Sequence, residues 1–466
     1  MKRIIAIIAL SSAALTLQAC GCDDSSYTPW DGMSDMGDTS WDHISEGTYD
    51  PSGDYVPEFP SGTGSIQGIV YSPNPPPGAD PSLRKFPISG ALVYITDREP
   101  SAIPDGVYCH ECVEMPETQP HDFSNPDGSF TITNLRGGTY LLVIQKGEFR
   151  KVRYIDVVDD VTTTIDEETT TFPNAHHPEA GDTTPSIAVA LGSYDDMEDI
   201  LAKIGLCDLD TESHAVQSTC DHIDFYDNGG GSGEPSFESL LRDPVAIDRY
   251  QIIFVPCSVA IDRYQIIFVP CSSSTTDTAI QDSTVAANVR RWVDAGGKWY
   301  VADWSYDLLE QVFPDFIDFE GDDASLGSAD SASGSFDTVG RAVDTDLRQW
   351  LELGISVNPD NVDFIENWDC ILALGAVPGT DPDTGEAITI VPDTYCEGPI
   401  TRSNSCMSGN APLTLTFPYG CGKVLYTTYH TVGEMSSSHA DLHLQEQILV
   451  YMILEIGLCT DPVIII

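Results

Sequence analysis

Positively charged residues are scarce in this sequence. It contains 21 lysine and arginine residues against 73 aspartate and glutamate residues in 466, which gives a formal net charge of −52. Nucleic acid is therefore a poor candidate partner, because affinity for a phosphate backbone comes from lysine and arginine side chains that neutralise it. An acidic excess keeps a protein soluble and suits a medium rich in salt or divalent cations. We interpret most of this charge as a solvated acidic surface.

Long apolar runs are also missing after the first twenty residues, so no membrane-spanning helix is predicted there. Residues 1–19 combine a basic start, Lys2 and Arg3, with a short apolar run, a pattern typical of an export signal. The sequence LQAC, which ends at Cys20, resembles the lipobox of bacterial lipoproteins. That resemblance implies cleavage before Cys20 and acylation of Cys20, with several acyl chains giving a stable membrane anchor. We expect a lipoprotein of the bacterial cell envelope, at the outer membrane or cell surface.

Export makes disulfides the default for the thirteen cysteines. For the motif CHEC, Cys109 to Cys112, we favour a local disulfide over half of a zinc site or a redox pair. No metal site is predicted from the cysteines, and the remaining pairing is left open. The other disulfide candidates are Cys207, Cys220, Cys370, Cys396, Cys406, Cys421 and Cys459.

Composition and periodicity divide the rest of the chain into regions. Residues 20–62 are acidic and rich in serine, glycine and proline, which is typical of a disordered linker. Residues 63–173 show short alternating strands and a tight turn at Asp127–Gly128, and they resemble the carboxypeptidase regulatory-like domain, a small transthyretin-like β-sandwich. The resemblance implies a non-catalytic accessory module. It is carried by Gly68, Val70, Gly90, Ala91, Val93, Ile95, Asp127, Gly128, Phe130, Leu135, Gly138, Tyr140 and Leu142.

A connector at 174–184 leads to strand and helix patterns that alternate over residues 185–466. Such alternation predicts a three-layer α/β domain with a mainly parallel sheet. The order of YQIIFVP, VDAGGKWYVAD and GKVLYTTYH resembles the class I glutamine amidotransferase-like superfamily, which implies a flavodoxin-like sheet. The overall expectation is a multidomain protein with a small β-sandwich and this α/β domain.

The superfamily places a catalytic cysteine at a strand-to-helix elbow and a histidine after a late strand. His430 stands at the histidine position, but the elbow position has Asp303, Trp304 and Ser305, with no cysteine and no G-x-S-x-G. Without that nucleophile the covalent route is missing, so the sequence favours a non-catalytic protein and leaves an enzyme open. As catalytic candidates we keep only His430, Asp303 and Ser305, which we expect to line a crevice at the carboxyl edge of the sheet.

Residues 245–258 and 259–272 are identical, and each contains the apolar strand sequence QIIFV. A central strand covered on both faces needs only one such copy. We expect the first copy to form the strand, since the surplus residues are then placed in a loop at the carboxyl edge, where insertions are tolerated. Cys257 or Cys271 is then one odd thiol, for which we favour a disulfide or an idle role over a nucleophile.

Acidic side chains gather at 320–337 and 381–386, but neither segment fits the EF-hand spacing. We favour flexible solvated loops over calcium sites there, and we predict no other cofactor. The leading hypothesis for function is a membrane-anchored extracytoplasmic lipoprotein that serves as a non-catalytic binding or structural module, with an unknown protein or carbohydrate partner. The alternative is an exported hydrolase of unknown substrate that uses the carboxyl edge of the sheet.

Overall fold

The structure is a computed structural model, and residues Val56–Ile466 form one compact unit in it. It describes residues 59, 61–73, 85–104, 106–109, 115–116, 118–192, 195, 197–207, 220, 222–229, 232–242, 263–271, 276–321, 323–329, 335–367, 371–382, 384–400, 409–429, 431, 442–457 and 463–465. The predicted signal and lipidation site lie outside these residues, as does the predicted linker except for residues 59, 61 and 62, the last two of which begin the first strand. No helix in the described part of the chain is long and apolar enough to cross a membrane.

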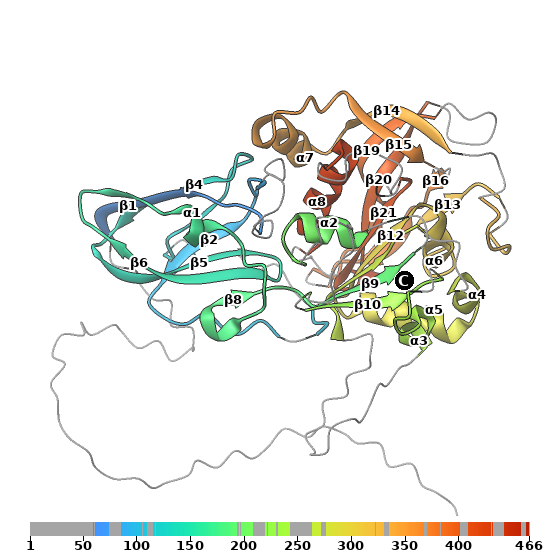
Figure 1. The fold of residues 1–466 in the computed structure, drawn as a ribbon, viewed down its shortest axis with the longest axis horizontal. Coiled ribbons are helices and arrows are strands. Elements are labelled where there is room, and N and C mark those ends of the chain that lie inside the picture. Colours follow the sequence, from blue (N-terminus) through green and yellow to red (C-terminus); the bar gives the residue numbers. More distant parts are fainter. Residues whose placement is uncertain are drawn as a thin grey trace, which may run out of the picture. The chain divides into compact units, whose positions relative to one another are not determined.

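The N-terminal strands form two sheets (Figure 1). A five-stranded sheet has the order β3-β2-β5-β6-β8 and a three-stranded sheet the order β4-β1-β7. Buried side chains of both sheets, such as Ile66 and Val93, belong to one apolar cluster. The strands are β1 (Ser61–Ile69), β2 (Leu92–Thr96), β3 (His121–Phe123), β4 (Ser129–Leu135), β5 (Gly138–Lys146), β6 (Phe149–Val157), β7 (Thr162–Thr164) and β8 (Asp182–Thr183), with the short helices α1 (Glu167–Thr170) and η1 (Pro178–Ala180).

The predicted tight turn before β4 is confirmed. Gly128 has a φ of +77°, a conformation that glycine adopts without the steric cost of a side chain. The carboxylate of Asp127 accepts hydrogen bonds from the backbone nitrogen of Ser129 at 3.0 Å and from its hydroxyl at 2.6 Å. The turn is thus held by its own side chains.

A nine-stranded sheet dominates the rest of the chain, in the order β10-β9-β11-β12-β21-β20-β19-β14-β15. Neighbours from β10 to β21 run parallel, and neighbours from β21 to β15 run antiparallel. The strands are β9 (Ile187–Leu191), β10 (Ile223–Asp227), β11 (Ile266–Val269), β12 (Lys298–Ala302), β14 (Phe336–Ala342), β15 (Val362–Asn367), β19 (Asp393–Pro399), β20 (Asn410–Tyr419) and β21 (Gly422–Thr427).

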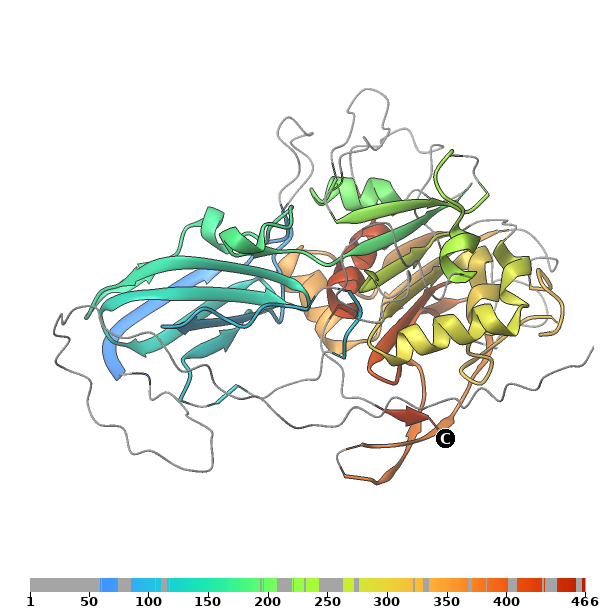
Figure 2. The same ribbon diagram turned by 90° about the horizontal axis from the view of Figure 1, so that it is seen from below.

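Helices cover both faces of the parallel strands (Figures 1 and 2). Successive residues of a strand point to opposite faces, so Ile266 and Phe268 share one apolar cluster with α2 and α8, whereas Ile267 and Val269 share another with α3, α5 and α6. The helices are α2 (Met197–Lys203), α3 (Phe237–Arg242), α4 (Thr276–Ile280), α5 (Ser283–Asp294), α6 (Asp307–Glu310), α7 (Thr345–Gln349), continued by a π-helical turn (Trp350–Gly354), and α8 (Leu444–Ile456).

Two small antiparallel sheets complete the described residues, one of β13 and β16 and one in the order β18-β17-β22. Their strands are β13 (Ile317–Phe319), β16 (Ile371–Leu374), β17 (Val377–Thr380), β18 (Ala387–Ile390) and β22 (Ile464–Ile465). Specific contacts also link the N-terminal sheets to the later part of the unit. Lys146 Nζ lies 2.7 Å from Glu455 Oε1, and Trp350 Nε1 donates to the backbone oxygen of Pro87 at 2.8 Å.

The predicted fold class is wrong. The protein is mostly β, with 41% strand against 22% helix, and its large sheets are mixed or antiparallel instead of mainly parallel and flavodoxin-like. The strand and helix patterns of residues 186–313 are present as elements, but the sheet continues past β21 through four antiparallel strands. The strands β15 and β19, between residues 359 and 399, are not predicted by the local sequence pattern.

The duplicated segment is also used differently from the prediction. Strand β11 comes from the second copy, and the first copy lies outside the described residues. The surplus residues therefore precede the strand, between α3 and β11. In the second copy the hydroxyl of Tyr264 donates to Asp224 Oδ2 at 2.5 Å, and Trp292 Nε1 donates to the backbone oxygen of Tyr264 at 3.0 Å.

Candidate functional site

Asp303 and Ser305 lie where the sequence placed them, directly after β12 in the short 3₁₀ helix Asp303–Tyr306. Asp303 has a φ of +45°, in the left-handed region that costs a residue with a side chain some strain. Both side chains are fully buried. The hydroxyl of Ser305 donates to the backbone oxygen of Pro270 at 2.7 Å. Ser305 thus connects the carboxyl ends of β12 and β11.

This geometry does not suit a serine nucleophile. A nucleophilic hydroxyl must reach both substrate and a general base, whereas that of Ser305 is enclosed and donates its proton to a carbonyl oxygen. The third candidate, His430, lies outside the described residues, so its place beside Asp303 stays a prediction. Its neighbours in sequence, Tyr429 and Thr431, are both buried.

Sequence reasoning missed Asp195, the residue around which this edge is organised. Asp195 follows β9 and is 1% exposed. Its carboxylate accepts from the backbone nitrogen of Cys271 at 3.1 Å and from that of Thr431 at 2.8 Å, and also from the Thr431 hydroxyl. One side chain therefore joins the segments that follow β9, β11 and β21. Hydrogen bonds from backbone N–H groups to a carboxylate satisfy its charge in a buried place.

Tyr300 of β12 lies beside the same cluster. Its pKa is raised well above the ordinary value, first by complete burial and then by the negative charge of Asp195. Its hydroxyl lies 3.0 Å from the hydroxyl of Thr427 in β21. The carboxyl edge is thus a buried polar cluster in which the side chains of Asp195, Tyr300 and Ser305 bond to other groups of the protein.

A cavity of about 300 Å³ lies elsewhere among the described residues, against β6 and α1. The ammonium of Lys85 forms an ion pair with Glu167 on its wall. Lys151 donates to the backbone oxygens of Glu168 at 2.7 Å and Thr171 at 2.9 Å, and burial lowers its pKa. The cavity is lined by Lys85, Lys151, Glu167, Glu168, Thr171, Phe172, Pro173, Asn174, Ala175, His177 and Asp182. Such a mixed-charge lining suits a small polar ligand.

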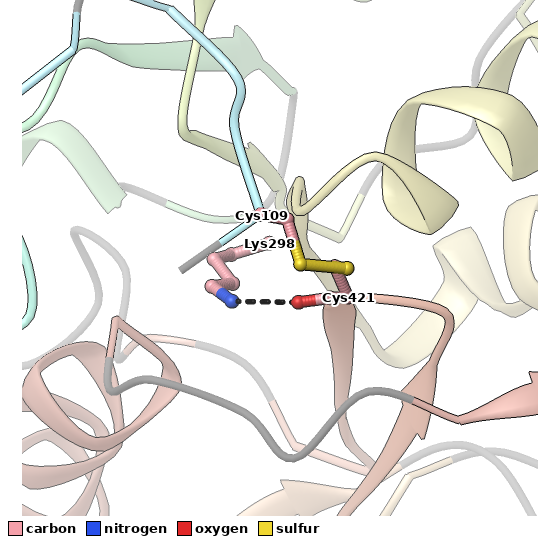
Figure 3. Close-up of a disulfide and its surroundings, with 3 residues drawn as sticks. All are labelled: Cys109, Lys298 and Cys421. Carbon is pink, nitrogen blue, oxygen red and sulfur yellow. Dashed lines mark hydrogen bonds between the residues drawn. A yellow bond between two sulfur atoms is a disulfide. The ribbon is translucent and has the colours of Figure 1, made fainter. Parts of the chain in front are cut away.

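The disulfide of Cys109 differs from the prediction. Cys109 is bonded to Cys421, 312 residues away, and the predicted bond within CHEC is wrong; Cys112 lies outside the described residues (Figure 3). Lys298 Nζ points to the same turn and donates to the backbone oxygen of Cys421 at 3.5 Å. The reason is geometric, since a disulfide needs Cα atoms within about 7 Å, and sequence proximity does not set that distance.

Two further cysteines predicted as disulfide candidates, Cys207 and Cys220, are bonded to each other. Cys396 is instead a free and fully buried thiol, whose pKa is raised to about 12 by burial. A thiol with so high a pKa is not a nucleophile near neutral pH. The remaining candidates, Cys370, Cys406 and Cys459, lie outside the described residues.

Comparisons with known proteins do not assign this chain to a family. No protein-family model and no curated protein matches it. Among solved structures, the minor pilin GBS52 of Streptococcus agalactiae is 17% identical over 24% of this chain and 44% of its own, with a TM-score of 0.15. The protein STM3548 of Salmonella typhimurium is 14% identical over 50% of this chain and 80% of its own, with a TM-score of 0.27. A β-galactosidase of Rahnella sp. R3 is 12% identical over 60% of this chain and 32% of its own, with a TM-score of 0.26. The chain spans less than half of the pilin, and likenesses of this size carry no functional argument.

Proposed function

We propose that this protein is a lipid-anchored lipoprotein of the bacterial cell envelope that acts as a non-catalytic binding or structural module. The anchor is proposed from LQAC at residues 17–20, behind a basic and apolar start. Several acyl chains on Cys20 give stable membrane attachment, whereas a single chain binds only marginally.

The Cys109–Cys421 disulfide is the observation that carries the extracytoplasmic part of the proposal. Disulfides persist in oxidising compartments and are rare where thiols are kept reduced. A second bond, Cys207–Cys220, supports the same conclusion. Both are consistent with a chain that is exported before it folds.

The non-catalytic part rests on the carboxyl edge of the parallel strands. Asp195 and Ser305 bind backbone groups there and hold neighbouring loops. The hydrolase alternative needs Ser305 as an accessible nucleophile, and its burial counts against that role. A serine-hydrolase probe should leave the protein unlabelled, and labelling that disappears in Ser305→Ala would overturn the non-catalytic assignment.

A partner protein or carbohydrate of the envelope would meet the polar cavity against β6. Its lysines and carboxylates offer both donors and acceptors to hydroxyl, amide and charged groups. Binding to a panel of cell-wall glycans and peptides should weaken in Lys151→Ala, and the exposed Arg98→Ala serves as the matched control. Equal binding by both variants would remove the cavity from the proposal.

Membrane fractionation tests the anchor directly. Cys20→Ser should move the protein from the membrane to the soluble fraction, while Cys22→Ser, two residues away in the same linker, should leave it in the membrane. Metabolic labelling with a fatty acid should follow the same pattern. Retention of unlabelled Cys20→Ser protein in the membrane would contradict lipidation at this residue.

A further inference from the structure

Two acidic side chains of α6 are buried, and each has one carboxylate oxygen without a hydrogen-bond partner among the described residues. Asp307 is 2% exposed and Glu310 is 3% exposed. Asp307 Oδ1 and Glu310 Oε2 have no hydrogen-bond partner among the described residues. Residues three apart on a helix lie on the same face, so the two carboxylates are neighbours. Burying a carboxylate without a partner is costly, and a bound cation or proton removes that cost.

The acidic segment that follows β13 contacts this helix and the residues beside it through backbone groups. The backbone nitrogen of Gly327 donates to Asp307 Oδ2 at 2.9 Å, which leaves Oδ1 as the available oxygen. Gln311 Nε2 donates to the backbone oxygen of Asp323 at 2.6 Å, and the backbone nitrogen of Ala329 donates to the hydroxyl of Tyr306 at 2.9 Å. Residues 323, 327 and 329 are therefore each attached to α6 or to a residue directly flanking it.

The electrostatic surroundings of the two carboxylates are acidic. The pKa of Glu310 is raised to about 7, first by burial and then by the negative charges of Asp323, Asp307 and Asp318. Burial raises the pKa of Asp307 to about 6, although the hydrogen bond from the backbone nitrogen of Gly327 acts to lower it. No lysine or arginine of the described residues contributes to either shift. The place thus accumulates negative charge without a cation from the protein.

We propose that Asp307 and Glu310 bind a calcium ion through Oδ1 and Oε2, with the backbone oxygen of Asp323 and water completing its coordination. Calcium accepts six to eight oxygen ligands in flexible geometry, which a site with two carboxylates and a loop can supply. Within the described residues no three histidine, cysteine or acidic side chains converge as a metal site, so side chains supply at most two ligands here, fewer than the four of a structural zinc site. Both carboxylates of the site come from α6, and the acidic segment 320–337 contributes only backbone groups.

The ion would neutralise the repulsion between the two side chains and hold the loop on the helix. An extracytoplasmic module meets calcium at millimolar concentrations, where sites with dissociation constants of about 10⁻⁴–10⁻³ M are filled. The calcium site is tested by its effect on stability. The experiment can therefore refute the calcium site without refuting the proposed lipid anchor, and a failure of the anchor would not refute the calcium site.

Thermal unfolding of the purified full chain, with 150 mM salt to screen diffuse binding, tests the site. In about 2 mM calcium the midpoint should lie about 2–5 °C above that in a calcium chelator. Isothermal titration calorimetry should show one calcium site, and magnesium at the same concentration should give a smaller shift, since it demands stricter octahedral geometry. No calcium-induced shift, or an equal shift with magnesium, would overturn the proposal.

Conservative variants test whether Asp307 and Glu310 cause the calcium-dependent rise in the unfolding midpoint. Glu310→Gln and Asp307→Asn should each abolish most of the calcium shift, and Asp318→Asn, an exposed acid in the same cluster, should retain it. The neutral variants should also melt higher than the wild type in chelator, because they relieve the repulsion. If a variant fails to fold, displacement of terbium by calcium from the wild type still measures the site. Full retention of the shift in Glu310→Gln, or of terbium by the wild type in excess calcium, would refute it.

Discussion

Cys109 and Cys421 join parts of the chain that are 312 residues apart, with their Cα atoms at 5.1 Å. Cys421 lies in the turn between β20 and β21, the pair at which the large sheet changes from parallel to antiparallel. Cys109 lies in the segment between β2 and β3 of the N-terminal five-stranded sheet. The disulfide thus links the N-terminal sheets covalently to the middle of the large sheet.

Removing this disulfide should destabilise the protein more than removing the other. In the loop-entropy model, closing a loop of 312 residues stabilises by about 2–3 kcal/mol more than closing one of 13. We therefore expect Cys109→Ala/Cys421→Ala to unfold at lower urea than Cys207→Ala/Cys220→Ala. If the two double variants had the same urea midpoint and the same dependence on urea, residual structure in the unfolded state would be cancelling the difference in loop entropy.

Buried Lys298 should make stability rise with pH in the alkaline range. Burial lowers its pKa to about 8, an effect that Glu148 opposes. The unfolded value is about 10.4, so between pH 8 and 10 the unfolded chain binds more protons and stability rises with pH. The free energy of unfolding of the wild type minus that of Lys298→Met should grow by about 2 kcal/mol over this range.

Chemical denaturation at several pH values measures that difference. Glu148→Gln removes the neighbouring negative charge, so it should move the onset of the rise to lower pH. A difference between wild type and Lys298→Met that stays constant from pH 8 to 10 would show that Lys298 titrates as an ordinary lysine.

Asp195→Ala should be strongly destabilising. It leaves the backbone nitrogens of Cys271 and Thr431 without their acceptor in a buried place, at about 1–3 kcal/mol for each group. Asp195→Asn keeps one oxygen acceptor and should cost less. Hydrogen exchange should increase first in the segments after β11 and β21. A variant as stable as the wild type would mean that other groups satisfy these nitrogens.

The duplication provides a matched pair of variants in identical local sequence. Ile267 of the second copy is fully buried in β11, between Ala188 and Trp299 of the neighbouring strands. Ile267→Ala should cost about 2–5 kcal/mol, whereas Ile253→Ala, the same position in the first copy, should cost much less. Urea unfolding compares them. A larger loss for Ile253→Ala would place the first copy in the sheet.

Local pattern was enough to predict the elements of the parallel half. The strands β9, β10 and β12 and the helices α2, α3 and α5 lie in the segments where apolar periodicity and turn residues indicated them. The hairpin of β20 and β21 was also expected around Gly420–Gly422, but β15 and β19 were missed because they carry many polar, glycine or proline residues and stand among turn-forming residues. Such a pattern also occurs in loops, and only pairing with a neighbouring strand makes it a strand.

The residues of the candidate site also divide into those that the local sequence predicts and those that it does not. Asp303 and Ser305 were placed correctly after β12, since a strand followed by a helix defines its own carboxyl end. Asp195 stands just before α2, where acidic residues are common because they interact favourably with a helix N-terminus, so its position in the sequence does not single it out. Its actual partners, Cys271 and Thr431, are distant in sequence, so no local pattern could have identified it.

The sequence by itself determined the charge excess, the export and lipidation motif, the periodicity of the parallel strands and the duplication, because each is a property of composition or of neighbouring residues. Only the tertiary structure decided that the second copy forms β11, that Cys109 pairs with Cys421 and that the sheet continues antiparallel. Two identical segments have identical local propensities, and a cysteine can bond only to the thiol that the fold brings within reach. Such choices depend on contacts between distant residues, which exist only once the chain has folded.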